Sequence, residues 1–403
     1  MELITLKNGL RLALEPVPAV RSASAGIWVA NGSRCEASDE NGISHFIEHM
    51  LFKGTTLRTA GQIASEMDRY GGQVNAFTSK EYTAFYLRTL DRHLTDALEV
   101  LCDMFFNSTF LDRDIEIEKT VIYEEIDMYE DSPEDLVCEN LAQSVYTGSP
   151  LGFPIIGSRE TLSPMTGTQL HNYMKRHYVP ENIVVAIAGS YSDAAIARIT
   201  ELFESIPVSP APQVVPAVYT RAESAVAKPI EQNHICLGFP GLCHHDADRY
   251  ALQVFQSILG GGMSSRLFQR VREDAGLCYS IYSYTSAHAD TGMLSIYCGL
   301  SRDAQEHAMT LIREEITRLL HDGPTPEELD RTRGQIEANL LMGLESTMTR
   351  MNQIGRSALL YGKLIDVDTV IERYDAVTRE DVLAIGRRVC DFDRMSTAIV
   401  GKI

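Results

Sequence analysis

Basic residues are scarce in this sequence. Its 36 lysines and arginines are outnumbered by 55 aspartates and glutamates, which gives a formal net charge of −19 at pH 7. Proteins that bind nucleic acids neutralise phosphates with Lys and Arg, so this balance argues against a nucleic-acid partner. An acidic surface would attract cationic peptides, and a surface that only keeps the protein soluble is an equally good interpretation.

Long apolar runs and targeting signals are also missing. No stretch of eighteen apolar residues is present to cross a bilayer, so no membrane partner is expected. Residues 1–9 show neither a basic region followed by an apolar core nor an Arg-rich amphipathic presequence. The sequence therefore predicts a soluble protein, and a cytoplasmic location follows by default.

Paired cysteines are the third absence. Eight cysteines are scattered through 403 residues, and none lies in a C-x-x-C motif. A chain of this length buries enough apolar surface without disulfides, so reduced thiols are expected. The run from Cys236 to Cys243-His244-His245 fits no zinc-ligand spacing, which favours a loop over a second metal site.

The chain repeats one pattern twice. A capped helix at 166–177 leads into an apolar strand at 182–189, and 378–388 leads into 396–401 in the same way. The initial Thr and the final Gly both recur 212 positions later. A second echo, offset by 214, pairs 114–119 with 328–333, and each copy follows a long amphipathic helix. These offsets indicate an internal duplication with a small insertion.

The duplication predicts two homologous domains that face each other. We place the N-terminal domain at 1–208, a proline-rich linker at 209–227 and the C-terminal domain at 228–403. Turns too short for a crossover helix join neighbouring strands, as within 75–87. The predicted fold class is α+β, with a mostly antiparallel sheet in each domain that is covered on one side by helices.

One motif carries chemistry. His45-Phe46-Ile47-Glu48-His49 has the form H-x-x-E-H, and in a helix His45 and His49 stand one turn apart on one face. Both imidazoles would then bind one metal ion, while Glu48 reaches a water on that ion. A satisfied histidine pair on a helix is the alternative.

A second predicted helix offers the missing ligand. On residues 115–128, Glu118 and Glu125 are seven positions apart and share a face. Glu125 would complete a His-His-Glu site with one open position for water, and Glu118 would orient a histidine. Taken alone, Glu118, Glu124 and Glu125 would be interpreted as a solvated helix face. The full set predicts metal-assisted hydrolysis, with Glu48 moving the proton of water to the leaving amine.

With these motifs the sequence resembles the pitrilysin and insulinase family of inverted zinc peptidases, and within it bacterial proteins similar to the β subunit of mitochondrial processing peptidase. The resemblance spans nearly the whole chain. It is carried by five segments, which are 45–54, 71–78, 118–126, 260–267 and 272–279.

The resemblance implies that His45, His49 and Glu125 bind one Zn²⁺ ion per chain, that Glu48 is the general base and that Glu118 supports the site. The expected function is that of a zinc endopeptidase that hydrolyses unfolded or extended peptides, with peptide or leader processing as one role. The alternative is a non-catalytic structural or partner subunit, as some family members have become.

Five further residues receive roles from the resemblance. Asn75, Ala76 and Phe77 would lie on an edge strand that pairs with the substrate peptide. Arg272 and Tyr279 would be contributed by the second domain, with Tyr279 near the tetrahedral intermediate. From the residues alone, an ordinary hairpin, a structural ion pair and a packed ring would be favoured instead.

The second half is predicted to bind no metal. Residues 252–259, which match the zinc helix, contain no His or Glu, and Asn339 stands where Glu125 stands in the first half. The family resemblance implies a clam-like chamber formed by the two halves. It also implies a dimer, either a homodimer or a heterodimer with a related chain.

Overall fold

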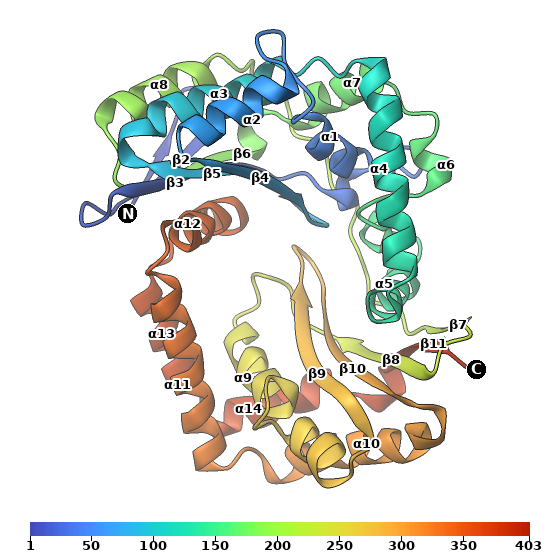
Figure 1. Cartoon of the computed structure of the whole chain (residues 1–403). Helices are drawn as coiled ribbons and strands as arrows, with labels where there is room; N and C mark the ends of the chain where they lie inside the picture. The colour runs from blue at the N-terminus through green and yellow to red at the C-terminus, as the bar shows by residue number, and fades with distance from the viewer. The chain divides into compact units, whose positions relative to one another are not determined.

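The computed structural model describes all 403 residues and divides them into two compact units, each built from three separate stretches (Figure 1). Unit 1 comprises residues 1–126, 153–215 and 342–365, and unit 2 comprises residues 127–152, 216–341 and 366–403. The predicted domain boundaries, which are 1–208, 209–227 and 228–403, describe the two sequence repeats and stay a prediction. The compact units exchange one segment each across that division.

Unit 1 contains a six-stranded sheet in the order β1-β2-β6-β3-β5-β4. All neighbouring strands are antiparallel except β2 and β6, which are parallel. Its strands are β1 (Glu2–Thr5), β2 (Arg11–Pro16), β3 (Ser22–Val29), β4 (Gln73–Thr78), β5 (Thr83–Leu90) and β6 (Ile183–Gly189). Its helices are α1 (Ile43–Met50), α2 (Ala60–Arg69), α3 (Leu94–Asn107), most of α4 (Asp112–Glu130), α6 (Arg159–Leu162), α7 (Gly167–His177), α8 (Asp193–Glu204) and α12 (Thr347–Tyr361).

Unit 2 contains a five-stranded sheet in the order β7-β11-β8-β10-β9, in which only β7 and β11 are parallel. Its strands are β7 (Glu223–Ala227), β8 (Gln232–Pro240), β9 (Cys278–Ala287), β10 (Gly292–Ser301) and β11 (Ser396–Gly401). Its helices are α5 (Pro133–Val145), α9 (Arg249–Gly260), α10 (Gln305–Asp322), most of α11 (Pro326–Gly343), α13 (Val367–Asp375) and α14 (Arg379–Val389).

The α+β fold class with two similar, mostly antiparallel units is confirmed. The helix caps recur as the duplication predicts: Thr166 and Gln169 form a capping box at α7, and Thr378 and Asp381 form one at α14. Residues 223–227, placed in the linker, form the edge strand β7. No helix of the chain is both long and apolar enough to span a membrane.

Helices cover both faces of each sheet, and the expectation of helices on one side only is therefore wrong. The cause is visible in β6, whose seven residues are all buried, so that alternate side chains on both faces need apolar cover. The second face of the unit 1 sheet packs against α12, which comes from the far end of the chain. The unit 2 sheet receives α5 from the N-terminal half in the same way.

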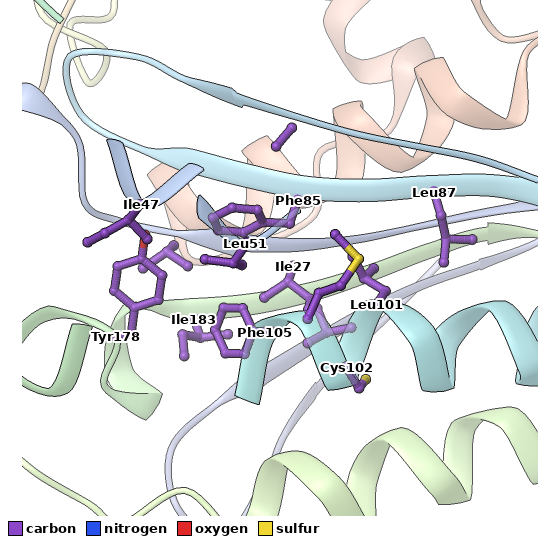
Figure 2. Close-up of a cluster of buried hydrophobic side chains, with 14 of the residues drawn as sticks. Ile27, Ile47, Leu51, Phe85, Leu87, Leu101, Cys102, Phe105, Tyr178 and Ile183 are labelled. Carbon is purple, nitrogen blue, oxygen red and sulfur yellow. The ribbon is translucent and has the colours of Figure 1, made fainter. Parts of the chain in front are cut away.

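The main core of unit 1 lies between its sheet and the helices α1, α3, α7 and α8. Figure 2 shows part of it, with Phe85 of β5 above Phe105 of α3 and Ile27 beside them. The rings of Phe85 and Phe105 have centroids 6.0 Å apart and meet edge to face. Ile47 of α1 and Leu51, which directly follows α1, reach the same core. This packing holds α1 against the sheet.

Candidate metal centre

Helix α1 presents its two histidines on the side away from the core. Its apolar residues are fully buried in the core of unit 1, and they are Ile43, Phe46, Ile47 and Met50. This 3.6-residue periodicity leaves His45 and His49 together on the other face, with ring centroids 4.5 Å apart. The sequence motif therefore folds into the predicted pair.

The N-terminus of α1 is fixed by a buried carboxylate. Glu36, which is 2% exposed, accepts hydrogen bonds from the backbone N–H groups of Gly42 at 2.8 Å and Ser44 at 2.9 Å. These are among the helix N–H groups that have no partner within the helix. Gly42 itself has φ of 93°, a left-handed conformation that glycine adopts without steric cost. The Glu36 carboxylate and the conformation of Gly42 together fix where α1 begins.

Helix α4 brings Glu125 to the two histidines. Its Oε2 lies 3.7 Å from His45 Nε2 and 3.5 Å from His49 Nε2. One ligand atom from each of the three residues lies within 4.8 Å of the others, and no other such group of His, Cys, Asp or Glu occurs in the chain. The run Cys236 to Cys243-His244-His245 accordingly forms no second group.

The donor set fits zinc. Tetrahedral sites with bonds of about 2.0–2.2 Å place donor atoms about 3.3–3.6 Å apart, close to the two Nε2–Oε2 distances. Two imidazoles and one carboxylate are a ligand set of catalytic zinc, which keeps a fourth position open. His45 also carries a buried Nδ1 atom with no hydrogen-bond partner. His45, His49 and Glu125 would hold the ion.

Glu118, which lies on α4 like Glu125, orients His49. Its Oε1 lies 2.8 Å from His49 Nδ1, and its Oε2 lies 2.5 Å from Lys53 Nζ. Burial raises the pKa of Glu118, but the contacts with His49 and Lys53 outweigh burial and lower it. An anionic Glu118 that accepts from Nδ1–H leaves Nε2 of His49 free to face Glu125. This is the arrangement that the sequence predicts for Glu118.

The two histidines titrate differently. Burial, followed by repulsion from His49, lowers the pKa of His45 to about 3. Burial also works to lower the pKa of His49, but the hydrogen bond that His49 donates to Glu118 and the charge of Glu125 outweigh it and raise the pKa. His45 is therefore neutral at physiological pH, as a metal ligand must be.

Glu48 is not one of the three ligand residues. Its Oε2 accepts a hydrogen bond of 2.6 Å from the hydroxyl of Thr78, at the end of β4. Burial raises the pKa of Glu48, and the Thr78 hydrogen bond offsets this only in part. A carboxyl with a raised pKa next to the ligand cluster suits a group that takes up a proton and releases it.

The predicted substrate strand is an edge strand. Asn75, Ala76 and Phe77 lie on β4, which pairs only with β5 and closes one end of the sheet. An edge strand leaves alternate backbone N–H and C=O groups available for another chain. The hairpin of β4 and β5 is therefore present, with one free edge.

Arg272 and Tyr279 lie together in unit 2. Arg272 lies in the last turn of the π-helix Phe268–Asp274, and its guanidinium lies 4.5 Å from the Phe268 ring centroid and 5.3 Å from that of Tyr279. Tyr279 is 78% exposed, which excludes the packed-ring interpretation. The stacking orients Arg272 without an opposite charge at hydrogen-bond distance, since Glu273 is 3.8 Å away.

Sequence reasoning assigned no role to Lys53 or Thr78. Lys53 follows α1 in the sequence, and its side chain reaches Glu118 on α4. Residue spacing does not predict this contact. For Thr78 a signal existed, because Val74 and Ala76 put position 78 on the core-facing side of β4, where a polar residue needs a partner. In unit 2, Asn339 lies on α11, the counterpart of α4.

This α+β fold and a His-His-Glu site with a neighbouring carboxylate define a protein of the zinc-peptidase class. The family model described as "Insulinase (Peptidase family M16)" matches residues 11–159. The model described as "Peptidase M16 inactive domain" matches residues 164–336. The chain belongs to this insulinase family.

The relatives agree with this membership. An uncharacterized zinc protease of Bacillus subtilis is 44% identical over 386 residues, which cover 96% of this chain and 94% of the relative. An uncharacterized zinc protease of Streptomyces coelicolor is 40% identical over 409 residues, which cover 99% of this chain and 89% of the relative. Both similarities run through the two halves.

Solved structures share the fold. A peptidase M16 inactive domain from Pseudomonas fluorescens superposes with a TM-score of 0.93 at 21% identity and covers 100% of this chain and 98% of its own. A protease from Helicobacter pylori has a TM-score of 0.91 at 21% identity, covering 99% and 98%. At this identity the likeness extends to the fold alone.

Proposed function

We propose that this chain is a zinc-dependent endopeptidase that hydrolyses unfolded or extended peptides, with one zinc ion per chain. The observation that carries the proposal is the convergence of His45, His49 and Glu125 from α1 and α4, with Glu48 beside them. Names of relatives as zinc proteases support the same reaction class.

The residues divide the work of peptide hydrolysis. Bound zinc supplies Lewis acidity, which lowers the pKa of water toward about 7 and polarises a peptide carbonyl. Glu48 takes the proton from the attacking water and delivers it to the leaving amine. Glu118 keeps His49 in the tautomer and orientation that Nε2 ligation needs.

An extended peptide is the substrate that suits this unit. It would add a strand to β4 along Asn75, Ala76 and Phe77, so that main-chain hydrogen bonds provide affinity. Arg272 and Tyr279 would assist from the second domain, with Tyr279 near the tetrahedral intermediate. We propose that the two domains enclose a chamber, which restricts the enzyme to unfolded chains and to peptide or leader processing.

We also propose a dimer, formed with a second copy or with a related chain, and a cytoplasmic location. Light scattering of the purified protein tests whether the chain forms a dimer. A monomer at micromolar concentration would overturn it.

The test of function combines metal analysis with peptide cleavage. Freshly purified protein should contain about one zinc per chain, cleave a quenched extended peptide, lose activity on chelation and recover it with zinc. Glu48→Gln should keep zinc and lose activity by about 10²–10⁴-fold, the usual contribution of a general base.

Glu125 and Glu124 provide a matched pair. Both lie on α4, but Glu124 is exposed while Glu125 faces the histidines. Glu125→Gln should lose zinc, and Glu124→Gln should retain zinc and activity. Undiminished activity in zinc-loaded Glu48→Gln would sink the mechanism, and fresh protein without zinc would favour the non-catalytic partner subunit.

A further inference from the structure

The hydroxyl of Thr78 donates a hydrogen bond to the Glu48 carboxylate, and it does so from strand β4 rather than from the helix that carries Glu48. The Oγ1–Oε2 distance is 2.6 Å. A hydroxyl that donates to a carboxylate makes a charge-assisted hydrogen bond, which is short and about twice as strong as a neutral one. We infer that Thr78 is the positioning residue for Glu48, resting on the proposed peptidase function.

The register of β4 explains why the hydroxyl is there. Val74 and Ala76 point into the core of unit 1, so Thr78 is the third residue on the same side of the strand. An apolar side chain would suit this face. A threonine keeps the β-branched shape that a strand favours and adds one donor, which is aimed at Glu48.

Thr78 also contacts a second threonine, Thr83. It lies opposite Thr83 in the β4–β5 ladder, and the two Oγ1 atoms are 3.5 Å apart. Thr83 is fully buried and donates its own hydroxyl proton to the backbone oxygen of Asn31 at 2.8 Å. With that proton engaged, Thr83 cannot compete for Glu48. The Glu48 carboxylate, at 2.6 Å, is therefore a nearer and stronger acceptor for the Thr78 proton than the Thr83 hydroxyl oxygen at 3.5 Å.

The consequence for the reaction concerns one carboxylate oxygen. With Oε2 engaged by Thr78, the other oxygen of Glu48 is left for the water proton. Ordering a glutamate side chain costs rotamer entropy, and the hydrogen bond offsets part of that cost before substrate arrives. Thr78 hydrogen-bonds to none of the three proposed zinc ligands.

Thr78 also connects the base to the proposed peptide strand. It is the last residue of β4, two positions after Ala76. A peptide that pairs along β4 would order the strand that holds Glu48 in place. Positioning of the base then improves when the substrate is extended far enough to engage the strand, which favours extended peptides in kcat rather than in KM.

The experiment uses Thr78→Val, which preserves shape and removes the hydroxyl, and Thr78→Ser, which restores it. Thr5→Val is the matched control, because Thr5 is an exposed residue on β1, the opposite edge strand of the same sheet. Each full-length variant is measured for zinc content, thermal unfolding, kcat and KM on the quenched peptide.

We expect Thr78→Val to keep its zinc and to lower kcat by about ten- to a hundredfold with KM changed by less than about twofold. Thr78→Ser should recover most of kcat, and Thr5→Val should match wild type. In a Glu48→Gln background the added Thr78→Val change should leave the residual rate unchanged, because no base remains to be positioned.

Wild-type kcat in Thr78→Val would overturn the inference, and so would loss of zinc together with kcat or failure of Thr78→Ser to recover. If Thr78→Val does not fold, the Thr78→Ser and Thr78→Ala pair supplies the same contrast. Wild-type protein without zinc-dependent cleavage would refute the proposed function itself. Normal wild-type cleavage with an unaffected Thr78→Val would refute only the role of Thr78.

Discussion

At the scale of single residues, the candidate site depends on how two carboxylates share His49. Glu118 lies 2.8 Å from Nδ1, and Glu125 lies 3.5 Å from Nε2. Lys53 balances the charge of Glu118 from the other side. Each imidazole nitrogen therefore faces its own carboxylate, and the ring has one orientation that leaves Nε2 for the metal.

Replacing Glu118 tests this arrangement. Glu118→Gln should weaken zinc binding by about 10- to 100-fold, since it removes the charge that fixes the His49 tautomer. Competition with a zinc chelator of known affinity measures the change. Glu124→Gln, on the exposed side of α4, is the control. Equal zinc affinity in Glu118→Gln and wild type would contradict the role of Glu118.

A second prediction concerns pH and the buried His177. Burial, followed by repulsion from Arg176, lowers the pKa of His177 to about 4 from an ordinary 6.5. Between these values the unfolded chain takes up a proton that the folded chain does not, so its contribution to stability is present above pH 6.5 and is lost toward pH 4. The free energy of unfolding should fall over this range.

The variant His177→Gln should show a smaller decrease in unfolding free energy between pH 6.5 and 4 than wild type. Urea titrations at several pH values measure it. His171→Gln is matched to it, because His171 is an exposed histidine of the same helix α7. A pH dependence that His177→Gln leaves unaltered would show that His177 is protonated without cost in the fold.

Part of the arrangement of this site can be predicted from the sequence. His45 and His49 share a face by helix periodicity, so their pairing is readable from spacing, and Glu125 follows because catalytic zinc needs a third ligand. Lys53 and Thr78 were not foreseen, since their contacts depend on how α1 docks on α4 and β4. Strand alternation indicates that Thr78 faces the core, but neither the partner of Thr78 nor that of Lys53 can be identified from a single sequence.

At the scale of elements, glycine allows α12 to approach the sheet of unit 1. A Cβ at Gly355 would lie 2.4 Å from Nε1 of Trp28, and one at Gly26 would lie 2.8 Å from Sδ of Met351. The indole N–H of Trp28 points at the same sulfur, 3.4 Å away. Close contact of helix and sheet here requires the absence of two side chains.

We expect Gly355→Ala to lower the free energy of unfolding by about 1–3 kcal/mol through overpacking against Trp28. Gly334→Ala is the matched control, because it is also a helical glycine but has nothing within 4 Å of a built Cβ. That change should stabilise by about 0.5–1 kcal/mol through helix propensity. Denaturant midpoints separate the two, and equal shifts would refute the packing argument.

At the scale of the whole molecule, the two repeats are not two independent folding units. Helix α12, from the C-terminal half, covers one face of the unit 1 sheet, and α5, from the N-terminal half, covers one face of the unit 2 sheet. These helices occupy equivalent places after α4 and α11. The duplication was readable from equal offsets, whereas the exchange was not, because the apolar face of a helix does not indicate which sheet it covers.

The exchange predicts that the contiguous half 1–208 will not be stable alone. Without α12 it would expose the apolar face formed by Trp28, Ala84, Val184 and Ala186, which are all buried in the full chain. A patch of this kind promotes association, so the fragment should aggregate or bind a hydrophobic dye strongly. Co-expression with 209–403, which supplies α12 and receives α5, should restore solubility and zinc binding. A monomeric fragment 1–208 with normal thermal unfolding and one bound zinc would show that α12 adds little to the stability of unit 1.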